Sequence, residues 1–223
     1  AGFSRVQFTP DLMPSDVIGT PVFNPREASF EFKRGPVFSN IILIDEINRA
    51  PAKTQSALFE VMEERQVTVD GFTHEMQYPF IVLATQNPIE QEGTYRLPEA
   101  QLDRFIFKVE IDYPTLQEEV RILTGQQGRT QAELLKDVTK LISADDIQRY
   151  RDVVQQVQIQ PRLVEYIATI VNETRNNPSL YLGASTRASL ALLKSSKATA
   201  ALRGRDFVIP EDIIEMAPHV LRH

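Results

Sequence analysis

The sequence contains no cysteine, which excludes disulfides and thiolate metal sites and makes a reducing compartment, the cytoplasm, the natural expectation. No stretch approaches the ~18 consecutive apolar residues that a membrane-spanning helix requires, so we expect no membrane span. The three histidines, His74, His219 and His223, are too scattered along the chain to suggest a metal cluster. What remains is a globular chain without a disulfide framework or a histidine metal centre.

Positive charge is in deficit, since the 223 residues carry 24 Lys and Arg against 30 Asp and Glu, a net charge of −6. This balance argues against a large nucleic-acid interface, although a local basic loop stays open. The hydrophobic fraction of 42% and the charged fraction of 24% are typical of a soluble globular protein. The length allows one large domain or two small ones.

The most informative stretch is Ile41-Ile42-Leu43-Ile44-Asp45-Glu46, in which four branched apolar residues run directly into two carboxylates. An all-apolar run predicts a strand buried on both faces, and such a strand ends at the sheet edge where α/β folds bind ligands. Nucleotide hydrolysis needs one carboxylate for magnesium and one for the attacking water. Because neighbouring strand residues point to opposite faces, we expect Asp45 to hold Mg²⁺ and Glu46 to orient the water. The alternative is a strand that ends in two solvated acids.

Strands that alternate with helices predict a doubly wound α/β layer in the first half of the chain. Strands are expected at 3–8, 40–45, 80–84 and 105–111, and helices at 11–19, 51–65 and 98–104. Residues 20–38, rich in proline and aromatics, predict a β-rich insertion, and Asp70-Gly71 predicts a hairpin over 66–78.

After Pro114 the pattern is helical. Helices are expected at 115–124, 143–155, 160–175, 185–203 and 210–217. Two apolar stripes are expected to be buried, one at Leu163, Ile167, Ile170 and Val171 and one at Leu190, Leu193, Ala198 and Ala201. We therefore predict an α/β domain over 1–113, a connecting segment over 114–139 and an all-α domain over 140–223.

Three further polar residues are candidate site residues. Asn87 ends the predicted strand at 80–84, where an amide can donate to a phosphate and accept from a water, although a turn residue before Pro88 is the more common case in isolation. Arg104 precedes a predicted strand and is either a helix C-terminal charge or an arginine finger that offsets transition-state charge. Arg187 begins a predicted helix, where a cation opposes the helix dipole, which hints at a nearby anion; a solvated surface arginine is the alternative.

These residues lie within a set of longer stretches that occur in a fixed order. The stretches are 7–16, 35–38, 43–51, 55–58, 84–88, 97–105 and 183–188. Together they resemble the MoxR group of the AAA+ ATPases over nearly the whole chain. The resemblance implies that Asp45 and Glu46 are the Walker B acids and that Asn87 is sensor 1. It also implies that Arg104 is the arginine finger and Arg187 is sensor 2.

The resemblance further implies ATP and Mg²⁺ as cofactors, bound between an α/β base and a helical lid. A hexameric ring is implied, in which Arg104 acts on a neighbouring subunit. Residues 20–38 are similar to the helix-2 insert of this clade and 66–78 to its hairpin before sensor 1, and both usually line a pore that contacts a client protein. A chaperone-like role in maturing protein complexes or inserting metal cofactors is implied, often with a von Willebrand factor A domain partner.

Two departures from the family pattern stand out. Thr186 stands where the sensor 2 stretch usually has a proline, so the helix entry loses a fixed φ. The family also needs a Walker A loop, Gly-x-x-x-x-Gly-Lys-Thr/Ser, whereas none of the nine glycines here is followed by lysine. The stretch 125–130 is a faint echo that we interpret as linker. We expect the loop to lie upstream of residue 1; a protein that lacks it is the alternative.

Other functions stay open at this point. A magnesium-chelatase-like motor subunit is a near relative, and a non-catalytic assembly scaffold would turn over no ATP. A nucleic-acid motor is disfavoured because the predicted hairpin at 66–78 carries no Lys or Arg, although Arg26, Lys33 and Arg34 lie in the other insertion.

Overall fold

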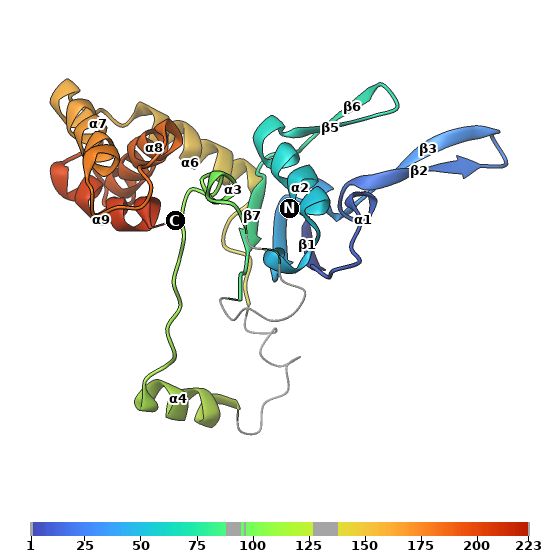
Figure 1. Cartoon of the computed structure of the whole chain (residues 1–223), viewed down its shortest axis with the longest axis horizontal. Helices are drawn as coiled ribbons and strands as arrows, with labels where there is room; N and C mark the ends of the chain where they lie inside the picture. Colours follow the sequence, from blue (N-terminus) through green and yellow to red (C-terminus); the bar gives the residue numbers. More distant parts are fainter. Residues whose placement is uncertain (1, 88–94, 96, 127–137, 223) are drawn as a thin grey trace.

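The structure is a computed structural model that describes residues 2–87, 95, 97–126 and 138–222 (Figure 1). The N-terminal elements are β1 (Phe3–Gln7), α1 (Pro14–Ile18), β2 (Gly19–Asn24), β3 (Ser29–Arg34), the 3₁₀ helix η1 (Pro36–Phe38), β4 (Ile41–Asp45), the 3₁₀ helix η2 (Ile47–Arg49), α2 (Ala52–Glu64), β5 (Gln66–Val69), β6 (Phe72–Glu75), β7 (Ile81–Ala84) and α3 (Glu99–Leu102). The helices that follow are α4 (Leu116–Gln126), α6 (Ala144–Gln156), α7 (Pro161–Asn176), α8 (Thr186–Leu202) and α9 (Pro210–Leu221).

A three-stranded parallel sheet in the order β1-β4-β7 forms the centre of the N-terminal part. Gln7 of β1 pairs with Asp45 of β4, and Ile44 of β4 pairs with Ala84 of β7. Since all three strands run in the same direction, their carboxyl ends meet at one edge of the sheet. The predicted buried strand before the acidic pair therefore ends where we expected it to.

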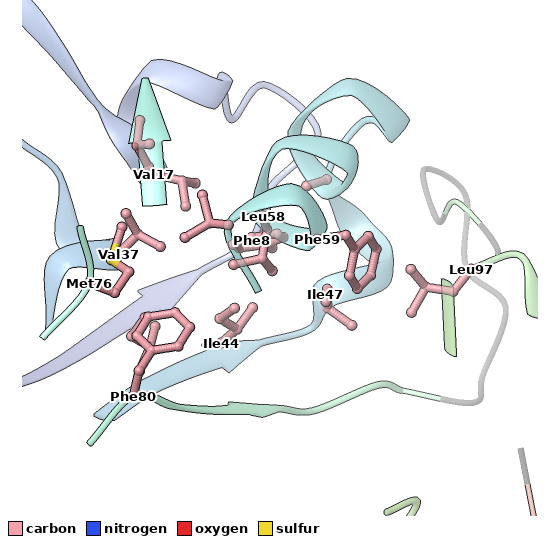
Figure 2. Packing of buried hydrophobic residues seen from close by; sticks show 14 residues of the cluster. Phe8, Val17, Val37, Ile44, Ile47, Leu58, Phe59, Met76, Phe80 and Leu97 are labelled. Atoms are coloured by element: carbon pink, nitrogen blue, oxygen red, sulfur yellow. The ribbon is translucent and has the colours of Figure 1, made fainter. Parts of the chain in front are cut away.

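Helix α2 packs its apolar face on this sheet. Leu58 and Phe59 of α2 are buried together with Phe8 and Ile44, as Figure 2 shows. Gln55, on the same face, is also buried, and its side-chain amide donates to the carbonyls of Ile47 and Ala50 at 3.2 and 3.0 Å. Each large apolar side chain in this cluster contributes about 1.5–3 kcal/mol by burial. The cluster therefore fixes the carboxyl end of β4 and the residues that follow it.

Two antiparallel hairpins, β2–β3 and β5–β6, project from the same side of the molecule, away from α7, α8 and α9 (Figure 1). They confirm the predicted β structure within 20–38 and 66–78. Phe32 of one hairpin stacks on His74 of the other, with ring centroids 4.5 Å apart. Exposed phenylalanines lie toward the hairpin ends, with Phe30 at 70% and Phe72 at 72% exposure.

Helices α6 to α9 enclose a second, separate apolar cluster, which contains Ile167 and Val171 as predicted. The predicted stripe of α8 is correct in part, since Leu193 and Ala201 pack against this cluster but Leu190 is 54% exposed. The buried face of α8 consists of Ala188, Leu192, Ser195, Ser196, Thr199 and Ala200. The hydroxyls of Ser195 and Ser196 donate back to the Leu192 carbonyl at 3.2 and 2.7 Å, which lets small polar residues be buried. An apolar stripe alone therefore does not define the whole buried face of this helix, which includes small polar residues.

The predicted strand at 105–111 is wrong, since the structure has no strand there. Phe105 packs on Phe59, but Ile111 is 91% exposed. Strand β7 also differs from the expectation of burial on both faces, because Ile81 and Leu83 are 41% and 52% exposed. An apolar run favours a strand but forms one only beside a pairing strand, and no strand among the described residues pairs with 105–111. The predicted helix at 98–104 is correct in place but only four residues long.

Helix α4 lies apart from the parallel sheet and from α7, α8 and α9 (Figure 1), and none of its residues is buried. Among the described residues, no helix has the length and apolarity needed to cross a membrane.

Candidate functional site

Asp45 is the last residue of β4, and Glu46 lies just beyond the strand. Glu46 has φ 54° and ψ 53°, the left-handed region that few non-glycine residues adopt. Its N–H donates to Thr85 Oγ1 at 3.0 Å, and the next N–H, of Ile47, donates to the Thr85 carbonyl at 3.0 Å. The expected strand alternation of the two acids is therefore wrong, since Glu46 has left the strand. Backbone strain of about 1–3 kcal/mol at such a residue is typical of functional sites.

The two carboxylates nevertheless have different partners. Asp45 Oδ2 accepts from Arg5 Nε at 2.5 Å. Glu46 Oε2 accepts from Gln7 Nε2 at 2.8 Å and from Arg49 Nη1 at 3.0 Å. Arg5 is 67% exposed and its partner Asp45 only 16%, so the arginine can leave while the acid stays in place. The two acids therefore lie at the sheet edge, and the arginine partner of Asp45 is one that a ligand can displace.

Asn87 follows β7 at the same edge of the sheet. Its carbonyl accepts from Asn48 Nδ2 at 3.3 Å, and Asn48 is buried just after the acidic pair. The ends of β4 and β7 are thus joined through Asn48 and Thr85. Asp45, Glu46 and Asn87 lie together as expected, while the roles of the three residues stay a prediction.

Arg104 and Arg187 meet at one carboxylate, that of Glu63 on α2. Arg104 lies in the turn after α3, and its Nη1 is 2.7 Å from Glu63 Oε2. Arg187 lies in the first turn of α8, and its Nη2 is 3.2 Å from Glu63 Oε1. All three side chains line a pocket together with Phe59 and Gln101. The fold therefore brings the two predicted arginines together from separate elements.

A second carboxylate, Asp103, holds the start of α8. Ser185 Oγ donates to Asp103 Oδ2 at 2.7 Å and accepts from the N–H of Arg187 at 2.9 Å, which caps the helix. The hydrogen bond and charge of Glu63, and then the charge of Asp103, raise the pKa of Arg187 above its ordinary value. The position of Arg187 at a helix N-terminus predicted a nearby anion. The chain itself supplies that anion, as the carboxylates of Glu63 and Asp103.

Sequence reasoning missed Glu63, Asp103 and Gln7. Asp103 directly precedes Arg104 in the sequence, so the reasoning that singled out Arg104 could also have included Asp103. Glu63 gave no signal, because an exposed glutamate near the end of an amphipathic helix is ordinary.

The structure forms two groups from the five predicted site residues. Asp45, Glu46 and Asn87 share the sheet edge, and Arg104 and Arg187 share Glu63. No hydrogen bond or ion pair between the described residues joins the two Walker-type acids to either arginine. Nor do the described residues contain a group of three or more potential metal ligands. Magnesium in nucleotide sites commonly takes one or two protein carboxylates plus phosphate oxygens and water, so the single Asp45 carboxylate fits it.

Comparison with known families identifies the class to which this fold belongs. A family model described as "ATPase family associated with various cellular activities (AAA)" matches residues 1–107, and one described as "AAA lid domain" matches residues 172–223. The parallel sheet followed by a helical lid, together with these matches, defines the AAA+ ATPase class. The predicted fold class is confirmed.

Individual relatives narrow the assignment. The "Uncharacterized protein YeaC" of Bacillus subtilis is 50% identical over 223 residues, covering 100% of this chain and 69% of that protein. "Chaperone MoxR1" of Mycobacterium tuberculosis is 46% identical over 99% of this chain and 60% of its own length. The crystal structure of a candidate ATPase from Cytophaga hutchinsonii is 45% identical, with a TM-score of 0.87 over 98% of this chain and 68% of that chain. The chain belongs to the MoxR family of AAA+ ATPases.

Proposed function

We propose that this chain is the core of an ATP hydrolase that remodels or matures client protein complexes in a chaperone-like way. One observation carries the proposal: Asp45, Glu46 and Asn87 lie at the carboxyl edge of one parallel sheet, and their fold belongs to a family of ATPases. Carboxylates that are partly buried at such an edge, as Asp45 and Glu46 are at 16% and 31% exposure, are costly for stability unless a cation or a reaction uses them.

Each residue has a proposed role at this edge. Asp45 would hold Mg²⁺ after exchange of Arg5, and Glu46 would orient and deprotonate the attacking water. When bound, Mg²⁺–ATP would supply the phosphoryl group, and its metal ion would offset the negative charge of the phosphates. Asn87 would contact the terminal phosphate without repelling it, because an amide carries no net charge. Gln7 and Arg49 hold Glu46 in its position beside the sheet.

The two arginines would act on nucleotide phosphates. We propose that Arg104 serves the nucleotide of a neighbouring subunit and that Arg187 contacts a phosphate in its own subunit or in the neighbour. The action of Arg104 on a neighbour requires a ring, for which a hexamer is the family expectation. The proposed function also requires that 1–113 and 140–223 are base and lid, joined by 114–139, so that hydrolysis alters their relative angle.

The projecting hairpins support a protein client. Phe30 and Phe72 expose 70% and 72% of their surface near the ends of β2–β3 and β5–β6. Exposed aromatic rings on such hairpins suit contact with apolar client segments, and the absence of Lys and Arg from 66–78 argues against nucleic acid. Cytoplasmic location, a von Willebrand factor A domain partner and a role in metal or cofactor insertion belong to the same proposal.

ATP turnover by the complete gene product tests this function, because the 223 residues contain no Walker A motif. We expect hydrolysis that requires Mg²⁺ and whose specific rate rises with protein concentration as rings assemble. No turnover at any concentration would favour the assembly scaffold instead.

A further inference from the structure

Glu63 is the point at which the two functional arginines meet. Its side chain is 41% exposed on α2, and each of its oxygens takes one arginine, Oε2 with Arg104 at 2.7 Å and Oε1 with Arg187 at 3.2 Å. We propose that Glu63 is a positioning residue that holds Arg104 and Arg187 as a pair and competes with nucleotide phosphate for them. This inference rests on the proposed function and assigns a regulator to its site.

The pairing is specific to Glu63 among the acids of this pocket. Glu60 and Glu64 also line the pocket, but neither forms an ion pair with any residue that the structure describes. Glu63 and Asp103 together balance the two guanidinium charges, with Asp103 Oδ2 3.6 Å from Arg187 Nη1. The arginines are therefore held by carboxylates of the same chain that imitate the charge of a phosphate.

The geometry allows Arg187 to exchange partners without disrupting the fold. Arg187 is 47% exposed, so its side chain can rotate, while the start of α8 stays fixed by Ser185 and Asp103. Arg104 is only 28% exposed, and its contact with Glu63 is shorter, 2.7 Å against 3.2 Å, so it is held more firmly. A phosphate would therefore displace Glu63 from Arg187 first.

That exchange changes how Arg104 is held. When Arg187 leaves Glu63 for a phosphate, the whole carboxylate becomes available to Arg104, the residue proposed to serve the neighbouring subunit. Phosphate binding at Arg187 would thus change how firmly Arg104 is positioned, through a single shared carboxylate.

The test is a comparison of Glu63→Gln with Glu64→Gln in the complete protein. Both substitutions remove one negative charge from the same pocket, but only the first removes the partner of the arginines. We expect Glu63→Gln to lower the Kd and the KM for ATP by about three- to fivefold, the effect of a partly exposed ion pair, with kcat changed by less than about twofold. Glu64→Gln should leave all three constants unchanged, and Glu63→Asp, which keeps the charge, should restore most of the wild-type Kd.

The outcomes separate this inference from the proposed function. Equal Kd values for Glu63→Gln and Glu64→Gln, in a protein whose wild type binds ATP, would overturn the role of Glu63 alone. A fall in kcat with an unchanged KM would also overturn it, because competition with phosphate predicts the reverse. A wild type that binds no ATP would overturn the proposed function itself. Thermal melting followed by circular dichroism shows whether a variant is still folded, and so identifies a change in Kd, KM or kcat that arises only from unfolding.

Discussion

Asp212 is a buried carboxylate of the helical lid that forms ion pairs with Arg203 and Arg205. Asp212 is 0% exposed, and its oxygens accept from Arg205 Nη2 at 2.6 Å and Arg205 Nη1 at 2.9 Å. Arg203 Nη1 donates to it at 3.3 Å, and the N–H of Ile209 at 3.0 Å. Asp212→Ala removes all four hydrogen bonds and leaves two arginines and the first turn of α9 without their acceptor.

The expected cost is about 3 kcal/mol of lid stability, the lower end of the range for breaking a buried ion pair. The lower end applies because Arg205 and Arg203 are 21% and 45% exposed, so water can hydrate the arginines that lose their partner. Glu215→Ala is the matched control. It removes the other carboxylate of Arg203, but that pair is exposed and its loss should cost less than about 1 kcal/mol.

The effect also depends on pH with a definite sign. Burial alone would raise the pKa of Asp212, but hydrogen bonds from Arg205 and from the Ile209 N–H outweigh it, so the pKa lies below its ordinary value of 3.8. A carboxyl with a depressed folded pKa stabilises the fold above its unfolded pKa and loses that effect as pH falls through the folded value. The deficit of Asp212→Ala should therefore be complete at neutral pH and shrink below pH 3.8.

Hydrogen exchange of α9 amides, followed by mass spectrometry at neutral and acidic pH, measures this local stability. If Asp212→Ala lowers the stability of α9 by less than about 1 kcal/mol at neutral pH, the reasoning is refuted. It is also refuted if the loss of stability persists unchanged below the folded pKa of Asp212.

Two further outcomes follow from the glycines and from Arg104. Gly35→Ala should destabilise the base by about 1–3 kcal/mol in urea denaturation, because the new Cβ would lie 2.3 Å from the Val17 carbonyl oxygen. Gly125→Ala is the control: its Cβ would have no atom within 4 Å, so the substitution should not lower the free energy of unfolding. Arg104→Ala should abolish ATP turnover in uniform rings, and mixing it with Glu46→Gln subunits, which keep the arginine, should restore turnover; no restoration would remove the proposed action on a neighbour.

Much of the fold follows from local patterns. The predicted helices at 143–155, 160–175 and 185–203 agree with α6, α7 and α8 to within a residue or two at each end, because 3.6-residue periodicity is a strong signal in long helices. The strand before Asp45 was equally clear, since its apolar run ends in two acids. The hairpin at 66–78 was fixed by Asp70-Gly71, and both residues have positive φ.

What the sequence did not predict depends on contacts between distant residues. Residues 105–111 have a strand-like pattern but no described partner strand. The buried face of α8 depends on serines whose hydroxyls bond within the helix. The left-handed backbone of Glu46 depends on two bonds to Thr85 from the next strand. The joint role of Arg104, Arg187 and Glu63 arises only when three separate elements pack together.

The most direct test of the account is to measure ATP binding and ATP turnover of the complete gene product side by side, with Glu46→Gln as the variant. Glu46 would orient the water but does not hold the nucleotide. Glutamine keeps the size of the side chain but removes the negative charge that lets the carboxylate act as a base. The account predicts that Glu46→Gln binds ATP with an unchanged Kd and loses turnover by at least about 100-fold, the usual contribution of a general base. Turnover equal to that of the wild type would contradict the assignment of this sheet edge as the hydrolytic site.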